Sequence, residues 1–255
     1  GETHIIESGA ISSPPLILLH GTSSNSATWF ADISSWSKHF RVLAVDLPGE
    51  PGLSFNKRMT LRSDEFSTWM TSLLAELDLP HISIVGMSLG GWIALDFASR
   101  FPGRVKALSL IAPSGLASQR LSFLFKALPL FFLGDWGLQR INKIVCHKVD
   151  MPDEVVEFGR LVAKHFLPVT ESIPVFTGEQ LTLLKMPIQY FGGSHDALLD
   201  TEKSAQRLRH HVPQAEVNLL HDTGHVILGQ TDKIQDFLIG AHHAESKSTC
   251  QQSCL

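Results

Sequence analysis

A serine between two glycines could supply a nucleophile in this chain. Residues 86–90 read Gly-Met-Ser-Leu-Gly, with Ser88 at the centre. This pattern is typical of a sharp strand-to-helix turn that exposes a hydroxyl, with room for a base beside it and a substrate above it. The pentapeptide alone is expected by chance in about one chain of this length in ten. The residues around it therefore have to support the hypothesis.

A serine nucleophile needs a general base, and the base needs a group that orients its ring. In chains with this kind of turn the order is Ser, then Asp or Glu, then His. The sequence supplies Asp196 shortly after the late strand at 188–193, and His225 after the last strand. We therefore predict a catalytic set of Ser88, Asp196 and His225.

Strands and helices alternate through most of the chain and would position these three residues. Apolar runs predict strands at 16–19, 41–45, 82–85, 105–111, 188–193 and 216–220. Apolar residues at helical spacing predict helices at 27–38, 60–79, from 89 onward, 201–212 and 231–238. This alternation implies βαβ units. We expect an α/β fold with a mostly parallel central sheet and helices on both faces.

Residues 114–185 interrupt the alternation, because they contain no convincing strand. Helical patterns occur there at 121–133, 136–148, 153–164 and 178–184. We predict a helical cap or lid inserted into a core of residues 1–113 and 186–245, with a disordered tail at 246–255. The apolar, aromatic segment 121–133 is interpreted as a lid lining an acyl or alkyl pocket, or alternatively as a helix packed on the core.

Taken together, these patterns resemble the α/β-hydrolase superfamily over about residues 14–240. The stretches that carry the resemblance are His20-Gly21, residues 46–49 (Asp-Leu-Pro-Gly), the serine turn at 86–90, the acid after Gly192-Gly193, and Gly224-His225. The resemblance implies an α/β-hydrolase fold and a serine hydrolase of the carboxylesterase kind that needs no cofactor.

The acid has two alternatives. Asp200 could replace Asp196, but it lies farther from the strand end and looks like the start of the next helix. Asp46 also ends a strand, yet it precedes Ser88 and matches a position that shapes a loop in the superfamily. Asp196 remains the favoured acid.

The base also has alternatives among the 13 histidines. His221 and His195 are the closest competitors, and His225 is favoured because Gly224-His225 after the last strand matches the superfamily pattern. A metal site at His221 and His225 would need both on one helix face, which Gly224 argues against. No metal is predicted.

Backbone NH groups are expected to stabilise the oxyanion that forms when Ser88 attacks a carbonyl. One donor is the NH of Leu89, which follows the nucleophile at the positive end of a helix. The resemblance implies that the NH of Thr22, just after His20-Gly21, is the other. The chain lacks an HGGG stretch, so a third donor is not expected.

Several activities use the same three catalytic residues. We favour hydrolysis of carboxylic esters through an acyl-enzyme on Ser88, because the apolar lid candidate offers no charge cluster for a polar substrate. Carbon-carbon bond hydrolases, thioesterases, peptidases, perhydrolases and a non-catalytic ligand-binding protein remain alternatives. Haloalkane dehalogenases and epoxide hydrolases are disfavoured because they use an aspartate in place of Ser88.

Composition restricts the partners. The 21 basic and 25 acidic residues give a net charge of −4, and without a basic run neither nucleic acid nor an anionic membrane is expected. No apolar run reaches about 18 residues, so no membrane span is predicted. Three cysteines (146, 250 and 254) do not indicate a disulfide framework, and we expect a cytoplasmic protein. The expected partner is a small ester-like substrate, and the sequence does not indicate an oligomeric state.

Overall fold

A computed structural model describes residues 1–255 except 121–122, 124–128, 131–132, 169–170 and 253–255. The strands are β1 (Ile5–Ser8), β2 (Pro15–Leu19), β3 (Arg41–Val45), β4 (Ile82–Met87), β5 (Val105–Ile111), β6 (Ile188–Gly193) and β7 (Glu216–Leu220). The α-helices are α1 (Phe30–Trp36), α2 (Glu65–Glu76), α3 (Leu89–Arg100), α5 (Gly134–Cys146), α6 (Asp153–His165), α7 (Gly178–Thr182), α8 (Thr201–His211) and α9 (Thr231–Gln252). Two short 3-10 helices are η1 (Ser26–Trp29) and η2 (Pro102–Arg104).

The strands of the described chain form one sheet in the order β1-β3-β2-β4-β5-β6-β7. Every pairing is parallel except that of β1 with β3, which is antiparallel. The predicted α/β fold with a mostly parallel sheet is therefore confirmed. The edge strand β1 was not predicted, because it is only four residues long and half-buried and lacks the apolar run that marks the central strands.

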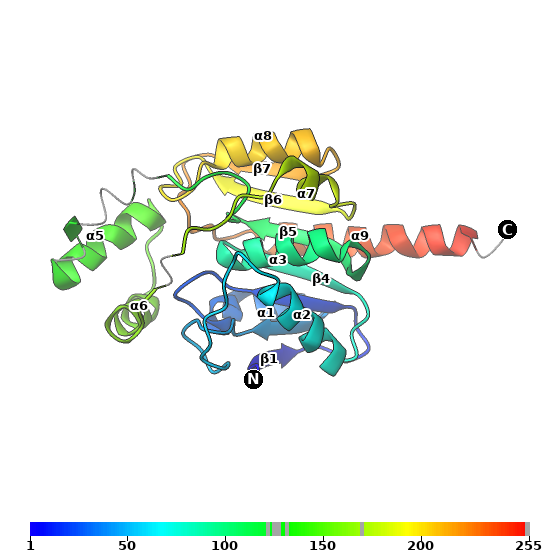
Figure 1. The fold of residues 1–255 in the computed structure, drawn as a ribbon, viewed down its shortest axis with the longest axis horizontal. Helices are drawn as coiled ribbons and strands as arrows, with labels where there is room; N and C mark the ends of the chain where they lie inside the picture. Colours follow the sequence, from blue (N-terminus) through cyan, green and yellow to red (C-terminus); the bar gives the residue numbers. More distant parts are fainter. Residues whose placement is uncertain (121–122, 124–128, 131–132, 169–170, 253–255) are drawn as a thin grey trace.

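Each face of the sheet has its own apolar layer, because successive side chains of a strand point to opposite faces. In β2, Leu16 and Leu18 belong to the cluster that also contains residues of α1 and α9. Their neighbours Ile17 and Leu19 belong to the cluster that contains residues of α2, α3 and α8. The sheet is thus buried between two helical layers. The carboxyl ends of its parallel strands all lie at the same end of the sheet (Figure 1).

Two of the helices that flank the sheet show the largest differences from their predicted limits. The helix predicted at 60–79 begins only at Glu65, whose carboxylate accepts the backbone NH of Thr60 at 2.9 Å and holds residues 60–64 in turns. The helix predicted to end at Leu238 continues as α9 to Gln252, past Gly240 and beyond the sheet (Figure 1). It therefore extends into the tail predicted at 246–255.

Helices α5 and α6 lie together beside one end of the sheet, apart from the helices that flank it (Figure 1). They correspond to the helices predicted at 136–148 and 153–164. Most of the apolar segment 121–133, predicted to line a pocket, lies outside the described residues. No helix among the described residues is both long and apolar enough to cross a membrane.

Candidate active site

Ser88 lies in the turn between β4 and α3 with a strained backbone. Its φ of 48° and ψ of −109° are rarely adopted by a residue with a side chain, and such strain costs roughly 1–3 kcal/mol. The flanking glycines make the turn possible. A Cβ on Gly90 would lie 2.1 Å from the carbonyl oxygen of Leu19, and one on Gly86 would lie 2.7 Å from that of Gly90. Strand and helix thus approach too closely for side chains at either position.

The structure brings Ser88, His225 and Asp196 together from three separate loops. Nε2 of His225 lies 3.1 Å from Oγ of Ser88, and Nδ1 of His225 lies 2.8 Å from Oδ2 of Asp196. The Asp196 side chain is fully buried, whereas the His225 side chain is 11% exposed. A ring with a carboxylate on one nitrogen and a hydroxyl on the other can take a proton from that hydroxyl.

Asp196 is held by its own loop. Its Oδ1 accepts the backbone NH groups of Leu198 at 2.7 Å and Leu199 at 3.0 Å. These bonds leave Oδ2 for His225 and fix the direction of the carboxylate.

The alternative residues lie elsewhere. Asp200 caps α8, where its carboxylate accepts the NH of Lys203 at 3.1 Å. The Asp46 carboxylate accepts the NH groups of Ser26 at 2.8 Å and Leu53 at 2.9 Å, and these bonds together with nearby His4 lower its pKa despite the opposing effect of burial. His221 is exposed on the protein surface.

The loop that carries Thr22 runs beside the nucleophile. A Cβ on Gly21 would lie 3.4 Å from Cβ of Ser88. Leu89 is the first residue of α3, so its NH has no partner within the helix. The backbone NH of Thr22 makes no hydrogen bond to another described residue. Leu89 thus directly follows Ser88, and Thr22 directly follows the glycine that lies beside it; their binding of an oxyanion remains a prediction.

The His20 side chain holds this loop in place by two hydrogen bonds. Nε2 of the fully buried His20 accepts the NH of Leu47 at 2.9 Å, so its proton is on Nδ1, which donates to the carbonyl of Gly21 at 2.7 Å. Burial lowers the pKa of His20 to about 4, although the bond to Gly21 opposes this. His20 is therefore a neutral residue that ties the loop to the end of β3.

Sequence reasoning missed Glu50, which holds the same loop from the solvent side. Its carboxylate accepts the NH of Ser23 at 2.6 Å and the hydroxyl of Thr22 at 3.4 Å. Burial raises the pKa of Glu50, while the bonds from Ser23 and Thr22 and the charge of Arg58 oppose the rise. A single acid in a loop rich in proline and glycine carries no local signal of such a role.

Residues of the predicted cap contact the predicted core at two places. At one place the carbonyl of Val145 in α5 accepts the backbone NH of His225 at 3.0 Å. At the other the Glu171 carboxylate accepts the hydroxyl of Thr60 at 2.9 Å and the NH of Leu61 at 3.1 Å. Two parts of the predicted insertion thus contact the core: Val145 bonds to His225, and Glu171 bonds to the segment that precedes α2.

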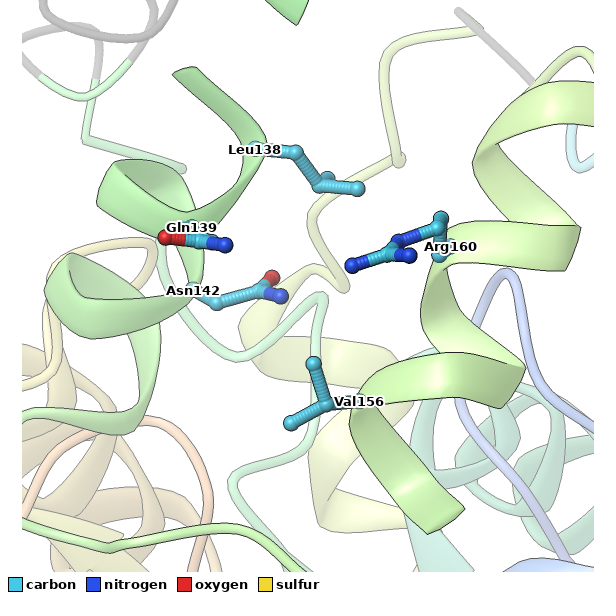
Figure 2. A pocket seen from close by; sticks show the side chains of 5 residues that line it. All are labelled: Leu138, Gln139, Asn142, Val156 and Arg160. Atoms are coloured by element: carbon cyan, nitrogen blue, oxygen red, sulfur yellow. The ribbon is translucent and has the colours of Figure 1, made fainter. Parts of the chain in front are cut away.

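A cleft between the two cap helices is separate from this site. Leu138, Gln139 and Asn142 of α5 face Val156 and Arg160 of α6 across it (Figure 2). None of the predicted site residues lines this cleft, which belongs to the packing of α5 against α6.

The sequence is similar to a known protein family and to two bacterial proteins. A sequence model of the alpha/beta hydrolase family matches residues 16–235. Carboxylesterase YbfK of Bacillus subtilis is 30% identical over 240 residues, which cover 89% of this chain and 79% of that protein. An uncharacterised carboxylesterase of the same organism, nap, is 28% identical over 241 residues, or 89% of this chain and 78% of that one.

The fold is similar to that of a solved structure. The crystal structure of carboxylesterase CesB (YbfK) from Bacillus subtilis superimposes with a TM-score of 0.82 at 27% identity, over 94% of this chain and 87% of the other.

Proposed function

The chain belongs to the alpha/beta hydrolase family, and we propose that it hydrolyses carboxylic esters with Ser88 as nucleophile, His225 as general base and Asp196 as orienting acid. The observation that carries the proposal is the continuous contact from Ser88 Oγ through both ring nitrogens of His225 to Asp196 Oδ2. The preference for esters rests on the similar proteins, two of which are carboxylesterases.

In the first half of the reaction, Nε2 of His225 takes the hydroxyl proton as Ser88 Oγ attacks the carbonyl carbon. Asp196 accepts the Nδ1–H and so keeps Nε2 free to act as a base. The carbonyl oxygen becomes an oxyanion, which the NH groups of Thr22 and Leu89 stabilise. His225 then gives this proton to the alcohol oxygen of the ester as the bond between that oxygen and the carbonyl carbon breaks, so the alcohol leaves and the acyl group stays on Ser88 Oγ.

In the second half, water replaces the alcohol. His225 takes a proton from the water as its oxygen attacks the acyl carbon, and the same NH groups bind the second oxyanion. The bond to Ser88 Oγ then breaks, the proton returns to Ser88, and the carboxylic acid leaves. In every step the proton is taken up or given back by Nε2 of His225. The chain's own side chains therefore supply all the acid and base chemistry that these steps require.

Residues 114–185 are proposed to be a cap that determines which acyl groups reach Ser88. Its attachments at His225 and at Thr60–Leu61 support this division of the chain into a core and a cap. A panel of p-nitrophenyl esters from acetyl to long acyl chains would measure the preference. We also propose a cytoplasmic location, on cysteine usage alone, which cell fractionation would test.

The function is tested by labelling and turnover of matched variants. The parent chain should react with one fluorophosphonate per chain and hydrolyse p-nitrophenyl acetate. Ser88→Ala should lose the label and at least about 10³-fold in kcat, because removing the nucleophile leaves only binding and oxyanion stabilisation. Ser12→Ala, which changes an exposed serine, should retain both properties. Retention of more than a few percent of turnover by Ser88→Ala would overturn the proposal.

A further inference from the structure

Two histidines and an aspartate from three segments meet where the cap contacts the core. His147 follows the last residue of α5, His195 lies between β6 and α8, and Asp222 lies in the loop after β7. One possible metal-binding atom of each side chain lies within 4.8 Å of the corresponding atom of the other two. The proposed ester hydrolysis uses none of these side chains.

The three side chains already lie close together. Nε2 of His147 lies 2.9 Å from Oδ1 of Asp222. The rings of His147 and His195 are stacked, with centroids 4.7 Å apart and planes inclined by 14°. Nδ1 of His195 lies 3.0 Å from the hydroxyl of Ser194, which restrains that ring. His195 is exposed and the other two are partly exposed, so an ion can enter from solvent.

We propose that His147, His195 and Asp222 form a binding site for a divalent transition metal ion of the zinc type. Each histidine would supply one ring nitrogen and Asp222 one carboxylate oxygen, and water would complete four-coordination. The ion would replace the hydrogen bond between His147 and Asp222.

The spacing fits such an ion once the His195 ring moves. Two ligands on a tetrahedral zinc ion with bonds of about 2.1 Å lie about 3.4 Å apart. The His147 and Asp222 atoms are closer than this, at 2.9 Å. A shift of the exposed His195 ring by roughly 1.4 Å or less would bring its nitrogen from the 4.8 Å limit to the required distance. Because a ring nitrogen binds a metal in the plane of its own ring, the exposed His195 ring must also rotate out of its stack on His147 to point at the shared ion.

The types of ligand select the ion. Imidazole nitrogens suit zinc, copper and nickel, whereas magnesium and calcium prefer sites made of oxygen ligands. Two of the three ligands here are imidazoles, so zinc should bind and magnesium should not.

Lys148 is a competing cation, because its ammonium lies 2.5 Å from the other Asp222 oxygen, Oδ2. Its side chain is 69% exposed and can leave the carboxylate. Substituting Lys148 should therefore strengthen metal binding or leave it unchanged.

The position of the site makes it a clamp between cap and core. His195 is adjacent in sequence to Asp196, and Asp222 lies in the same loop as His225. His147 lies two residues after Val145, whose carbonyl accepts the NH of His225. A bound ion would join the end of α5 to both loops and restrict the movement of the cap there.

Calorimetric titration with zinc chloride at pH 7.5 tests the site without measuring catalysis. The parent should carry Cys250→Ser and Cys254→Ser, so that these thiols do not bind zinc, and no polyhistidine tag. We expect one zinc ion per chain and no magnesium binding. His147→Asn and His195→Gln should each weaken zinc affinity at least tenfold. Asparagine suits position 147 because it tolerates the φ of 59° found there.

The matched control is His221→Gln, an exposed histidine one residue before Asp222. It should bind zinc as the parent does, and Lys148→Gln should bind at least as tightly. Zinc should also raise the Tm of the parent and of His221→Gln, but not that of His195→Gln. The proposal is overturned if the parent does not bind zinc up to millimolar concentration, if magnesium binds equally well, or if His147→Asn and His195→Gln bind zinc like His221→Gln.

Discussion

The Asp196 carboxylate is bound on one oxygen by two backbone NH groups of its own loop and on the other by Nδ1 of His225, at 2.8 Å. The two bonds within the loop fix the direction of the carboxylate independently of His225. In consequence the position of Nε2, which faces Ser88 at 3.1 Å, depends on the Asp196 loop as well as on the His225 loop.

Asp196→Asn should lower kcat by about 10³–10⁴-fold while the protein stays folded. An amide nitrogen in place of Oδ2 would favour the wrong tautomer of His225, with its proton facing Ser88. Steady-state hydrolysis of p-nitrophenyl acetate measures the effect.

Asp200→Asn is the matched control, because the Asp200 carboxylate caps α8 by accepting the NH of Lys203. It should leave kcat within about twofold, since asparagine is a comparable cap. If Asp200→Asn lowered kcat as much as Asp196→Asn, the assignment of the acid would be wrong.

The fold could be predicted from sequence wherever a local pattern carries the information. Buried parallel strands such as β2 and β4 are short apolar runs, and the turn at Ser88 requires glycines that appear within five residues. The relation of Asp196 to His225 could be proposed because both follow late strands, whose carboxyl ends meet at one edge of a parallel sheet.

Contacts between distant segments could not be predicted in this way. The bonds between Glu50 and Ser23 and between Val145 and His225 join residues far apart in the chain. They involve backbone groups, which every residue type can provide, so the sequence carries no signal for them. The end of α9 was predicted wrongly because a local signal was misleading. Gly240 breaks the apolar pattern, yet the helix backbone continues through it.

Glu50→Ala should lower kcat about tenfold or more with a smaller change in KM. The carboxylate fixes the NH of Ser23 and the hydroxyl of Thr22, and its loss would loosen the loop that presents the Thr22 NH to the oxyanion. Transition-state stabilisation should therefore suffer more than substrate binding. Steady-state kinetics with one acetyl ester separates the two constants.

Glu50→Gln serves as the conservative comparison, because its amide oxygen can still accept the NH of Ser23. It should recover most of the lost kcat. Equal losses in both variants would argue that the charge of Glu50, and not its hydrogen bonds, matters for turnover.

Gly90→Ala should destabilise the fold by about 3 kcal/mol or more, because the new Cβ would overlap the carbonyl oxygen of Leu19 in the central strand β2. Backbone atoms on both sides cannot move apart without breaking the packing of α3 on the sheet. Gly103→Ala is the control, since a Cβ there meets no atom within 4 Å. Urea unfolding of the two variants should give clearly different midpoints, and similar midpoints would contradict the close approach.

His20 should make stability depend on pH in a defined window. Its folded pKa of about 4 lies below the ordinary value of 6.5, so between these values the unfolded chain binds a proton that the folded chain does not. The contribution of neutral His20 is complete above pH 6.5, declines as pH falls toward 4, and changes no further below that. The loss amounts to about 3 kcal/mol.

Because many groups titrate in this range, the test compares the parent with His20→Gln, which has no ring to protonate. Urea unfolding should show the variant less stable at pH 7.5, since the bonds to Gly21 and Leu47 are lost or weakened. The gap should shrink by about 3 kcal/mol as pH falls from 7.5 to 4, because only the parent has to keep an uncharged imidazole in a buried site. A gap that stays constant with pH would show that His20 is protonated as readily in the folded chain as in the unfolded one.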